Sequence, residues 1–323
     1  MKVAILGPHP ADFFGSKLDF SNDKTVEHPS PWIVNLCKSL SKFIGIELHL
    51  IALSKNIRCS QTFHYRNITY HFLKYYKERF RLATLYQFDR WRIYRRIREI
   101  RPDILHSHGT EDIYSYASVT SGYPCLVSLQ GIINEVIKYE TNRLLSPMRL
   151  IKYFEKYTIR RAKYINAKTP YAFNCVKKFI SNKSKIFFME DPVSERYFEV
   201  QNYEGKNRIL FVGTIIKRKG IEDLIQSIYL LKEKIRNIKL RIIGWGREDY
   251  QNQMLNYINN NNLQANIDFL GFKNSEEIAD ELSKSCLLVL PSYIENCPNV
   301  VLEAMAAGKP VVATNVGVVF HIW

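Results

Sequence analysis

The sequence predicts an α/β protein that consists of two doubly wound, Rossmann-like domains. Short apolar runs alternate with amphipathic segments along the chain, which is the pattern of repeated βαβ units. The chain has 323 residues, enough for two domains of ordinary size. A polar stretch at residues 195–207 interrupts the alternation. We therefore expect a linker there, an N-terminal domain at residues 1–200 and a C-terminal domain at residues 201–323.

The elements of the first domain follow from buried apolar runs and from signals at helix ends. Ser30 is placed to cap a helix that begins at Pro31, and Gly45 is placed to end it. Pro102 ends a later helix, because a proline cannot continue one. Strands are expected at residues 3–6, 46–53, 61–73, 103–106, 124–129, 164–167 and 185–188. Helices are expected from residue 31, over 83–100, from 111, over 149–161 and from 170.

The second domain begins with a strand at residues 208–212 and ends with a βαβ unit in LLVLPSYIENCPNVVLEAMAAGKPVVAT. In that unit Asn296 is placed to cap a helix, Pro298 suits the first helical position, and Gly308 can adopt the left-handed conformation that ends a helix. A further helix is expected after Gly220. The remaining strands are expected at residues 239–243, 267–270, 287–290 and 310–313.

Composition limits the class of protein. The chain is 46% hydrophobic and 24% charged, as in soluble globular proteins. No apolar run approaches the roughly 20 residues that cross a bilayer, and the start, MKVAILGPHP, indicates a strand rather than a signal peptide. The six cysteines form no CxxC pair and have no histidine at zinc spacing, which argues against a metal site. We therefore expect a protein of the reducing cytoplasm.

The net charge is +15, and basic residues are concentrated at residues 74–101. This charge favours an anionic partner, which could be nucleic acid, an acidic substrate or the inner leaflet of a membrane. A solvated basic helix face is the simpler interpretation. No helix-turn-helix, RNA-binding or zinc pattern is present, so we expect no specific nucleic-acid partner.

Two glutamates stand out in the last βαβ unit. Glu295 lies in the loop after a strand, and Glu303 lies within the following helix. Ligands of open α/β sheets bind beyond the carboxyl ends of strands, and the start of a helix attracts phosphate. We expect a nucleotide diphosphate at the helix start, near Asn299, Val300 and Val301. Glu303 could then bind ribose hydroxyls and Glu295 the hydroxyls of a sugar, although two ordinary surface glutamates would also fit.

The loop GTIIKRKG offers positive charge for such a diphosphate. Gly213 permits a tight turn after the preceding strand, and Arg218 and Lys219 stand just before Gly220 and the helix that follows it. Two fixed cations beside a helix N-terminus suit the charge that accumulates on a departing diphosphate. A solvated basic loop is the alternative.

The phrase SYIENCPNVVLEAMAAGKPVVATNVG resembles the donor-binding signature of the GT4-type (group 1) retaining glycosyltransferases, in which two glutamates flank seven residues. The resemblance implies that Glu295 contacts the donor sugar, that Glu303 contacts the ribose, and that Phe272 lies near the nucleotide base. It implies that Arg218 and Lys219 correspond to phosphate-binding residues, although Thr214 stands where the family commonly has arginine. It also implies the GT-B fold, with two domains facing each other across a cleft, retention of configuration and no essential metal.

Two loops of the first domain, at residues 106–111 and 130–131, resemble the acceptor-side loops of the same family. A histidine often follows the second of these strands, but Gln130 stands at that position and cannot act as a base. His108 and Glu111 are the nearby titratable groups, and we expect His106 to be a packed strand residue.

After Thr314 the chain continues NVGVVFHIW. Members of the family usually carry a second glycine and an acidic residue soon after the position of Gly317, followed by further helices. Val318 and Val319 stand here instead. We therefore expect an incomplete, truncated second domain with an altered diphosphate site and exposed apolar surface.

These observations predict a glycosyltransferase that moves a sugar from a nucleotide-diphosphate donor to a hydroxyl of a lipid-linked or polysaccharide acceptor. No cofactor is expected, and the sequence has no DxD pair to hold a metal against a diphosphate. The basic helices predict attraction to an anionic membrane face or an acidic glycan. Three alternatives stay open, namely an inactive truncated fragment, a nucleotide-sugar epimerase of the same fold and a basic nucleic-acid-binding protein.

Overall fold

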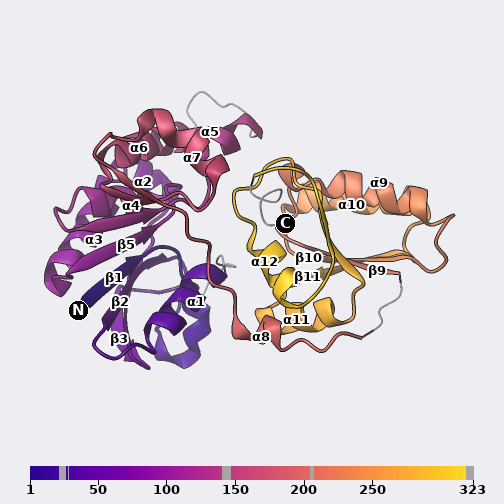
Figure 1. Ribbon diagram of the computed structural model, residues 1–323, viewed down its shortest axis with the longest axis horizontal. Helices are drawn as coiled ribbons and strands as arrows, with labels where there is room; N and C mark the ends of the chain where they lie inside the picture. The colour runs from indigo at the N-terminus through magenta and orange to yellow at the C-terminus, as the bar shows by residue number, and fades with distance from the viewer. Residues whose placement is uncertain (22–26, 28, 140–146, 204–206, 318–323) are drawn as a thin grey trace. The chain divides into compact units, whose positions relative to one another are not determined.

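The structure is a computed structural model that describes residues 1–21, 27, 29–139, 147–203 and 207–317. Contacts divide the chain into two compact units, which we call unit 1 (Met1–Pro192) and unit 2 (Val193–Trp323) (Figure 1). The boundary expected at residue 200 therefore lies inside unit 2. The physical reason is a short helix, α8 (Glu195–Phe198), which packs against α11 (Ser275–Ser283) and α12 (Asn299–Ala306) and buries Tyr197. Part of the polar stretch expected to be a linker is thus an element of unit 2.

Unit 1 contains an eight-stranded sheet within the described residues, in the order β3-β4-β2-β1-β5-β6-β7-β8. Neighbouring strands are parallel except for the antiparallel pair of β3 and β4. The strands are β1 (Lys2–Leu6), β2 (Glu47–Ser54), β3 (Gln61–Tyr65), β4 (Ile68–Lys74), β5 (Ile104–His108), β6 (Cys125–Ser128), β7 (Tyr164–Asn166) and β8 (Lys185–Phe187).

Helices cover both faces of this sheet. Side chains alternate between the two faces along each strand, so apolar residues on both faces need to be covered. In β1, Ile5 packs in one core with Ile33, whereas Ala4 and Leu6 pack in the other core with Ile93. This is the doubly wound arrangement that the sequence predicts. The helices are α1 (Pro31–Leu40), α2 (Glu78–Ala83), α3 (Gln87–Ile100), α4 (Ile113–Val119), α5 (Ile133–Val136), α6 (Pro147–Arg161) and α7 (Pro170–Val176), with 3-10 helices at Ala11–Lys17, Ile137–Tyr139 and Lys177–Phe179.

Two elements predicted in unit 1 are each divided in the structure. The strand expected at residues 61–73 is a hairpin of β3 and β4, and Arg66 in its turn has φ 47°. The helix expected at residues 83–100 is replaced by α2 and α3, because Leu85 and Tyr86 have φ 47° and 59°, which an α-helix does not allow. Leu85 is consequently 57% exposed.

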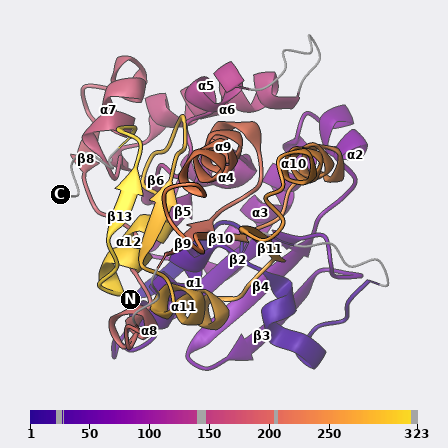
Figure 2. The ribbon, with the colours of Figure 1, turned by 90° about the vertical axis from the view of Figure 1, so that its right-hand side faces the viewer.

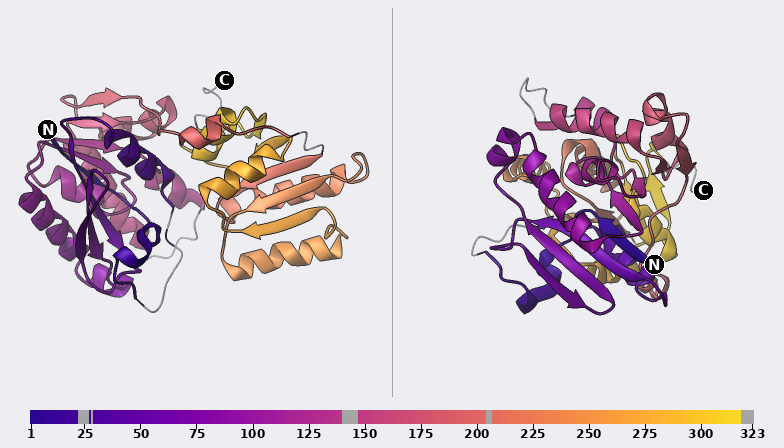
Figure 3. Two further views of the ribbon diagram at one scale, coloured as in Figure 1. Left: turned by 90° about the horizontal axis from the view of Figure 1, so that it is seen from below. Right: turned by 90° about the vertical axis from the view of Figure 1, so that its left-hand side faces the viewer.

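Unit 2 contains a five-stranded, fully parallel sheet in its described part, in the order β11-β10-β9-β12-β13. Its β9 strand alternates in the same way, since Phe211 packs with α9 and α10 while Leu210 packs with α11 and α12. Figures 2 and 3 show the helices on the two faces. The elements are β9 (Arg208–Val212), a 3-10 helix (Lys217–Lys219), α9 (Ile221–Leu231), β10 (Lys239–Ile243), α10 (Glu248–Asn260), β11 (Ile267–Gly271), β12 (Leu287–Leu290) and β13 (Val311–Ala313).

The ends of α12 differ slightly from expectation. Pro298 occupies the N-cap position, and Asn299 is the first helical residue, so Asn296 is not the cap. Gly308 has φ 66° just beyond the end of α12, which confirms its predicted role. Val318 and Val319, on which the expected alteration of the diphosphate site rests, lie outside the described residues.

Candidate functional site

The carboxyl ends of the strands of unit 2 meet at one edge, because the sheet is parallel. The loops after β9 and β10 lie very close to each other there. Ile215 and Gly246 pair as an isolated parallel bridge, and a Cβ atom on Gly244 would overlap with the carbonyl oxygen of Gly213. Gly244 also has φ 145°, so glycine is required both by the lack of room for a Cβ atom and by the backbone conformation. Gly213, predicted in the site, is thus held at this edge by its neighbour strand.

An ion pair joins two of the predicted site residues at the same edge. The ammonium of Lys219 contacts Oε1 of Glu295, and both side chains are largely buried. The backbone holds the two loops together, since the amide of Tyr293 donates to the carbonyl of Arg218 at 2.9 Å. Gly220 has φ 66° and lies against the carbonyl oxygen of Pro291, so a side chain there would separate the loops. The structure therefore brings together residues that are distant in sequence.

Arg218 stands beside this pair with a half-buried side chain. Within the described residues its guanidinium makes no ion pair. The edge thus carries one cation paired with Glu295 and one that is available to an anion. Ser292 adds a buried hydroxyl oxygen that has no hydrogen-bond partner in the described part of the chain.

The start of α12 reaches the same edge. Asn299 and Val300 are its first two residues, where an α-helix leaves N–H groups without internal partners. The N–H of Val301, by contrast, donates to the carbonyl of Pro298 at 3.0 Å, and the side chain of Val301 is fully buried in the core. The contribution of Val301 in this structure is therefore to packing.

Glu303 lies one helical turn into α12 and is buried. Burial raises the pKa of its carboxyl group to about 7, and a hydrogen bond from Tyr197 opposes part of that rise. Burial, together with the same contact, raises the pKa of Tyr197. Sequence reasoning missed Tyr197, which lies in the stretch interpreted as a linker. Its only signal was that the segment contains aromatic residues, with Phe198 and Tyr203 beside Tyr197.

Two aromatic rings lie beyond the ends of β10 and β11. Phe272 follows β11 and is 47% exposed. It contacts Trp245 edge to face, with ring centroids 5.6 Å apart. Trp245 was not singled out from the sequence, although it stands between the two glycines of GWG. The pair gives this edge a partly exposed aromatic surface.

Gly317, which follows β13, lies against the loop that carries Glu295. A Cβ atom on Gly317 would overlap with the carbonyl oxygen of Glu295, and Gly317 has φ 62°. The hydroxyl of Thr314 donates to the carbonyl of Ser292. Glu295 is thus fixed between the loop after β13 and Lys219.

Unit 1 has a cavity of about 430 Å³ at the carboxyl ends of its central strands. All three predicted acceptor-side residues line it. The cavity is lined by Pro8, His9, Glu27, Trp32, Leu53, Lys55, Tyr75, His108, Gly109, Glu111, Asp112, Tyr114 and Gln130. The cavity therefore combines aromatic rings with carboxyl, imidazole and amide groups.

The ionisable groups of this cavity are strongly perturbed. Burial raises the pKa of Glu111 to about 7, although its carboxylate accepts a hydrogen bond from the N–H of Gly131. Burial also lowers the pKa of His108 well below its usual value, and nearby His106 and Lys168 lower it further. His106 itself hydrogen-bonds the hydroxyl of Ser128 at 2.8 Å, so it is a packed strand residue as expected.

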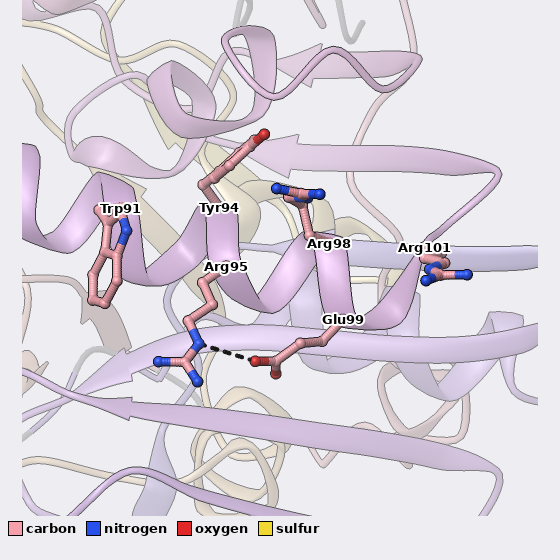
Figure 4. A pocket seen from close by; sticks show the side chains of 6 residues that line it. All are labelled: Trp91, Tyr94, Arg95, Arg98, Glu99 and Arg101. Carbon is pink, nitrogen blue, oxygen red and sulfur yellow. Dashed lines mark hydrogen bonds and ion pairs between the residues drawn. The ribbon is translucent and has the colours of Figure 1, made fainter.

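The basic segment at residues 74–101 is only partly exposed. Arg81 is buried and forms ion pairs with Asp89 and Asp112, so it belongs to the interior. The outer face of α3 carries a shallow pocket lined by Trp91, Tyr94, Arg95, Arg98, Glu99 and Arg101 (Figure 4). No helix in the described part of the chain combines the length and apolar character needed to span a bilayer.

Comparison with known proteins agrees with these features. The family model described as "Glycosyl transferases group 1" matches residues 193–322. An uncharacterized glycosyltransferase of Methanocaldococcus jannaschii is 28% identical over 294 residues, which cover 84% of this chain and 76% of that protein.

Solved structures share the fold at low identity. Sucrose-phosphate synthase from Thermosynechococcus elongatus is similar over 100% of this chain and 84% of its own, with a TM-score of 0.76 and 16% identity. HepE of Anabaena, solved in complex with UDP and glucose, is similar over 100% of this chain and 83% of its own, with a TM-score of 0.66 and 14% identity. The fold is that of the GT-B glycosyltransferases. Over residues 193–322 the chain is thus similar to the group 1 glycosyltransferases.

Proposed function

We propose that this chain transfers a sugar from a nucleotide-diphosphate donor to a hydroxyl of a lipid-linked or polysaccharide acceptor. We propose further that the anomeric configuration is retained and that no metal is essential. The observation that carries the proposal is the Lys219–Glu295 pair at the carboxyl ends of β9 and β12, beside the guanidinium of Arg218, which makes no ion pair with the described residues.

In this proposal the bound donor separates Lys219 from Glu295 and gives each side chain a new partner. The diphosphate takes the ammonium of Lys219 and the guanidinium of Arg218, while Glu295 turns to hydroxyls of the donor sugar. The first N–H groups of α12, at Asn299 and Val300, add partial positive charge. Fixed cations in a partly buried site stabilise the charge that develops on the leaving diphosphate without reorganising during the reaction.

The nucleoside would lie along the rest of the edge. Glu303 is the proposed partner of the ribose hydroxyls, and the rings of Phe272 and Trp245 offer a surface for the base. The hydroxyl of Ser292, which has no hydrogen-bond partner among the described residues, supports a polar ligand near Glu295, because buried hydroxyl groups normally have such a partner.

The acceptor is proposed to use the cavity of unit 1, with His108, Glu111 and Gln130 among its contacts. Attraction to the acceptor is proposed to involve the outer face of α3. Trp91 there is 51% exposed and lies beside Arg95, Arg98 and Arg101. An exposed indole with clustered guanidinium groups suits the anionic surface of a membrane.

The experiment that tests the donor site is calorimetric binding of UDP and of GDP to the purified protein. We expect saturable binding of one nucleotide and a roughly tenfold to hundredfold weaker affinity for Lys219→Ala and for Glu303→Ala, because each removes a charged or strongly polar contact. Glu233→Ala is the matched control, since Glu233 is exposed and lies outside the site. Its affinity should equal that of the wild type.

Circular dichroism of each variant separates loss of binding from loss of folding. Failure of the folded wild-type protein to bind either nucleotide would contradict the proposed donor site. Equal loss of affinity in the Glu233→Ala control would contradict the assignment to Lys219 and Glu303.

A further inference from the structure

A buried polar chain joins the carboxyl ends of four neighbouring strands of unit 1. His108 is the last residue of β5, Gln130 follows β6, Lys168 follows β7 and Asp191 follows β8. The ammonium of Lys168 contacts Oδ2 of Asp191 and also donates to Oε1 of Gln130. Nε2 of Gln130 lies 3.2 Å from Nδ1 of His108. The Lys168 and Asp191 side chains are only 1% and 5% exposed, so solvent does not compete for these contacts.

The chemistry of the four groups fixes the direction of every hydrogen bond. An ammonium can only donate, so the amide of Gln130 must turn its oxygen toward Lys168. The amide nitrogen then faces His108, and an amide nitrogen can also only donate. Nδ1 of His108 must therefore accept, and the single proton of the neutral imidazole must be on Nε2.

Protonation of both ring nitrogens is disfavoured by the same arrangement. A proton on Nδ1 would face the N–H of Gln130 with no acceptor between them. The ring of His106 lies 4.1 Å from that of His108, centroid to centroid, and the ammonium of Lys168 lies at the other end of Gln130. His108 is thus a neutral imidazole with a defined tautomer.

The protonated nitrogen is the one with no partner. Nε2 of His108 is buried and has no hydrogen-bond partner within the described residues, and the whole side chain is 4% exposed. An unpaired buried donor is costly, so such groups usually have a ligand or an ordered molecule as their partner. His108 lines the cavity of unit 1, which could hold that partner.

The other lining groups indicate what the partner is. Glu27, Glu111 and Asp112 place three carboxyl groups around the cavity, and Asp112 is paired with Arg81. Glu27 and Glu111 remain, against one lining ammonium, that of Lys55. This excess of carboxyl groups disfavours a ligand that carries phosphate or carboxylate. Carboxylates beside aromatic walls and a neutral N–H donor suit the hydroxyl groups of an uncharged sugar.

We propose that His108 is a hydrogen-bond donor, held in its Nε2–H tautomer by Gln130, Lys168 and Asp191, for a hydroxyl oxygen of a neutral sugar in this cavity. The proposal rests on the proposed function, because it takes that sugar to be part of the acceptor. Gln130, Lys168 and Asp191 are then positioning residues. His108 does not serve as the base that deprotonates the acceptor, since its only lone pair on nitrogen is occupied by Gln130.

The tautomer can be measured directly by ¹⁵N NMR of the histidine rings in the full chain, with His108→Asn to assign the signal. We expect Nδ1 of His108 to be unprotonated and Nε2 to be protonated at neutral pH. Gln130→Glu replaces the amide donor by a carboxylate acceptor, so the proton should move to Nδ1. The ring signals of His64, which is exposed and distant in sequence, should not change and provide the internal control.

A wild-type signal protonated at Nδ1, or at both nitrogens, would overturn the proposal. An unchanged tautomer in Gln130→Glu would overturn the role of the polar chain. These readouts need no nucleotide and concern only unit 1, so a failed donor site in unit 2 would leave them unaffected and the two failures can be told apart.

The ligand is tested by titrating the same sample with glucose, galactose and N-acetylglucosamine, and separately with glucuronate. We expect a neutral sugar to shift the Nε2–H signal of His108 and glucuronate to shift it much less. Absence of a shift with every neutral sugar, or a larger shift with glucuronate, would overturn the assignment of the ligand class.

Discussion

Glu303, the proposed contact of the ribose, is a buried carboxyl group that has a cost in stability. Its pKa is raised to about 7, mainly by burial, while the hydroxyl of Tyr197 gives it one hydrogen-bond partner. An ordinary glutamate has a pKa near 4.3 in an unfolded chain. The folded protein therefore holds this proton more tightly than the unfolded chain does, and ionising Glu303 opposes folding.

Glu303→Gln is expected to change the pH dependence of stability. Between about pH 4.5 and about pH 7 the folded wild type binds more protons than the unfolded chain, so its free energy of unfolding falls as pH rises. The full effect of this group is about 4 kcal/mol and is present above pH 7. Glutamine keeps the acceptor for Tyr197 but cannot ionise. The free energy of unfolding of the variant, measured relative to that of the wild type, should therefore be larger at about pH 8 than at about pH 5.

Thermal or urea unfolding at the two pH values, followed by tryptophan fluorescence, provides the measurement. Glu233→Gln removes an exposed carboxyl group and is the matched control, for which the difference from wild type should not depend on pH. A Glu303→Gln variant that tracks the wild type at both pH values would show that Glu303 is not perturbed.

At the level of elements, the candidate donor site depends on backbones that approach each other at the ends of β9, β10 and β12. Gly244 faces the carbonyl of Gly213, and Gly220 faces that of Pro291. Side chains at these positions would push the loops apart and shift Lys219 relative to its partner. The geometry of the site is thus fixed by the spacing of strand ends as much as by the functional side chains.

Gly244→Ala is predicted to destabilise unit 2 more than Gly271→Ala. Both glycines have positive φ, so both substitutions strain the backbone by about 1 kcal/mol or more. Of the two, only Gly244 would also have its added Cβ atom overlap with a neighbouring carbonyl, whereas no atom of the described residues lies within 4 Å of the corresponding position at Gly271. Denaturant unfolding of the two variants tests the difference, and equal stabilities would contradict the close packing of β9 and β10.

Much of the element pattern could be predicted from the sequence because it is encoded locally. The strands at residues 208–212, 239–243 and 287–290 match the structure, since each is rich in apolar residues and has clear flanking turns. Arg66 and Leu85 break their elements through positive φ at residues that usually avoid it, and no periodicity reveals that. The roles of the site residues stay predictions.

Partners that are far apart in sequence could not be predicted at all. Tyr197 reaches Glu303, and Lys168 reaches both Gln130 and Asp191, through packing of elements that the sequence does not place relative to each other. Lys219 and Glu295 are likewise partners that are far apart in sequence. A resemblance named those two residues, but only the fold brings them into contact.

For the whole molecule, the net charge of +15 is the dominant property. Part of the basic segment at residues 74–101 is used internally, as the buried Arg81 shows. The remaining exposed guanidinium groups of α3 lie beside Trp91 on one face. A surface of this kind attracts anionic lipids by about 1 kcal/mol for each basic residue near the membrane.

Sedimentation with lipid vesicles tests this attraction. We expect binding to vesicles that contain phosphatidylglycerol, little binding to pure phosphatidylcholine, and weakening by salt because the attraction is screened. The double variant Arg98→Ala with Arg101→Ala should bind more weakly by about 2 kcal/mol. Lys234→Ala with Arg236→Ala removes the same charge from exposed positions in unit 2 and is the control. Equal weakening in both variants would assign the binding to net charge and contradict a specific face.

The contact between Lys219 and Glu295 has a kinetic consequence for the proposed transferase. Each incoming donor has to separate the two side chains, and each outgoing diphosphate allows them to rejoin. Leaving a charge buried without a partner is strongly unfavourable, so the rejoined pair makes the vacated site more stable. Such a site binds its nucleotide less tightly than one with permanently unpaired cations, and it clears the spent nucleotide faster after each turnover.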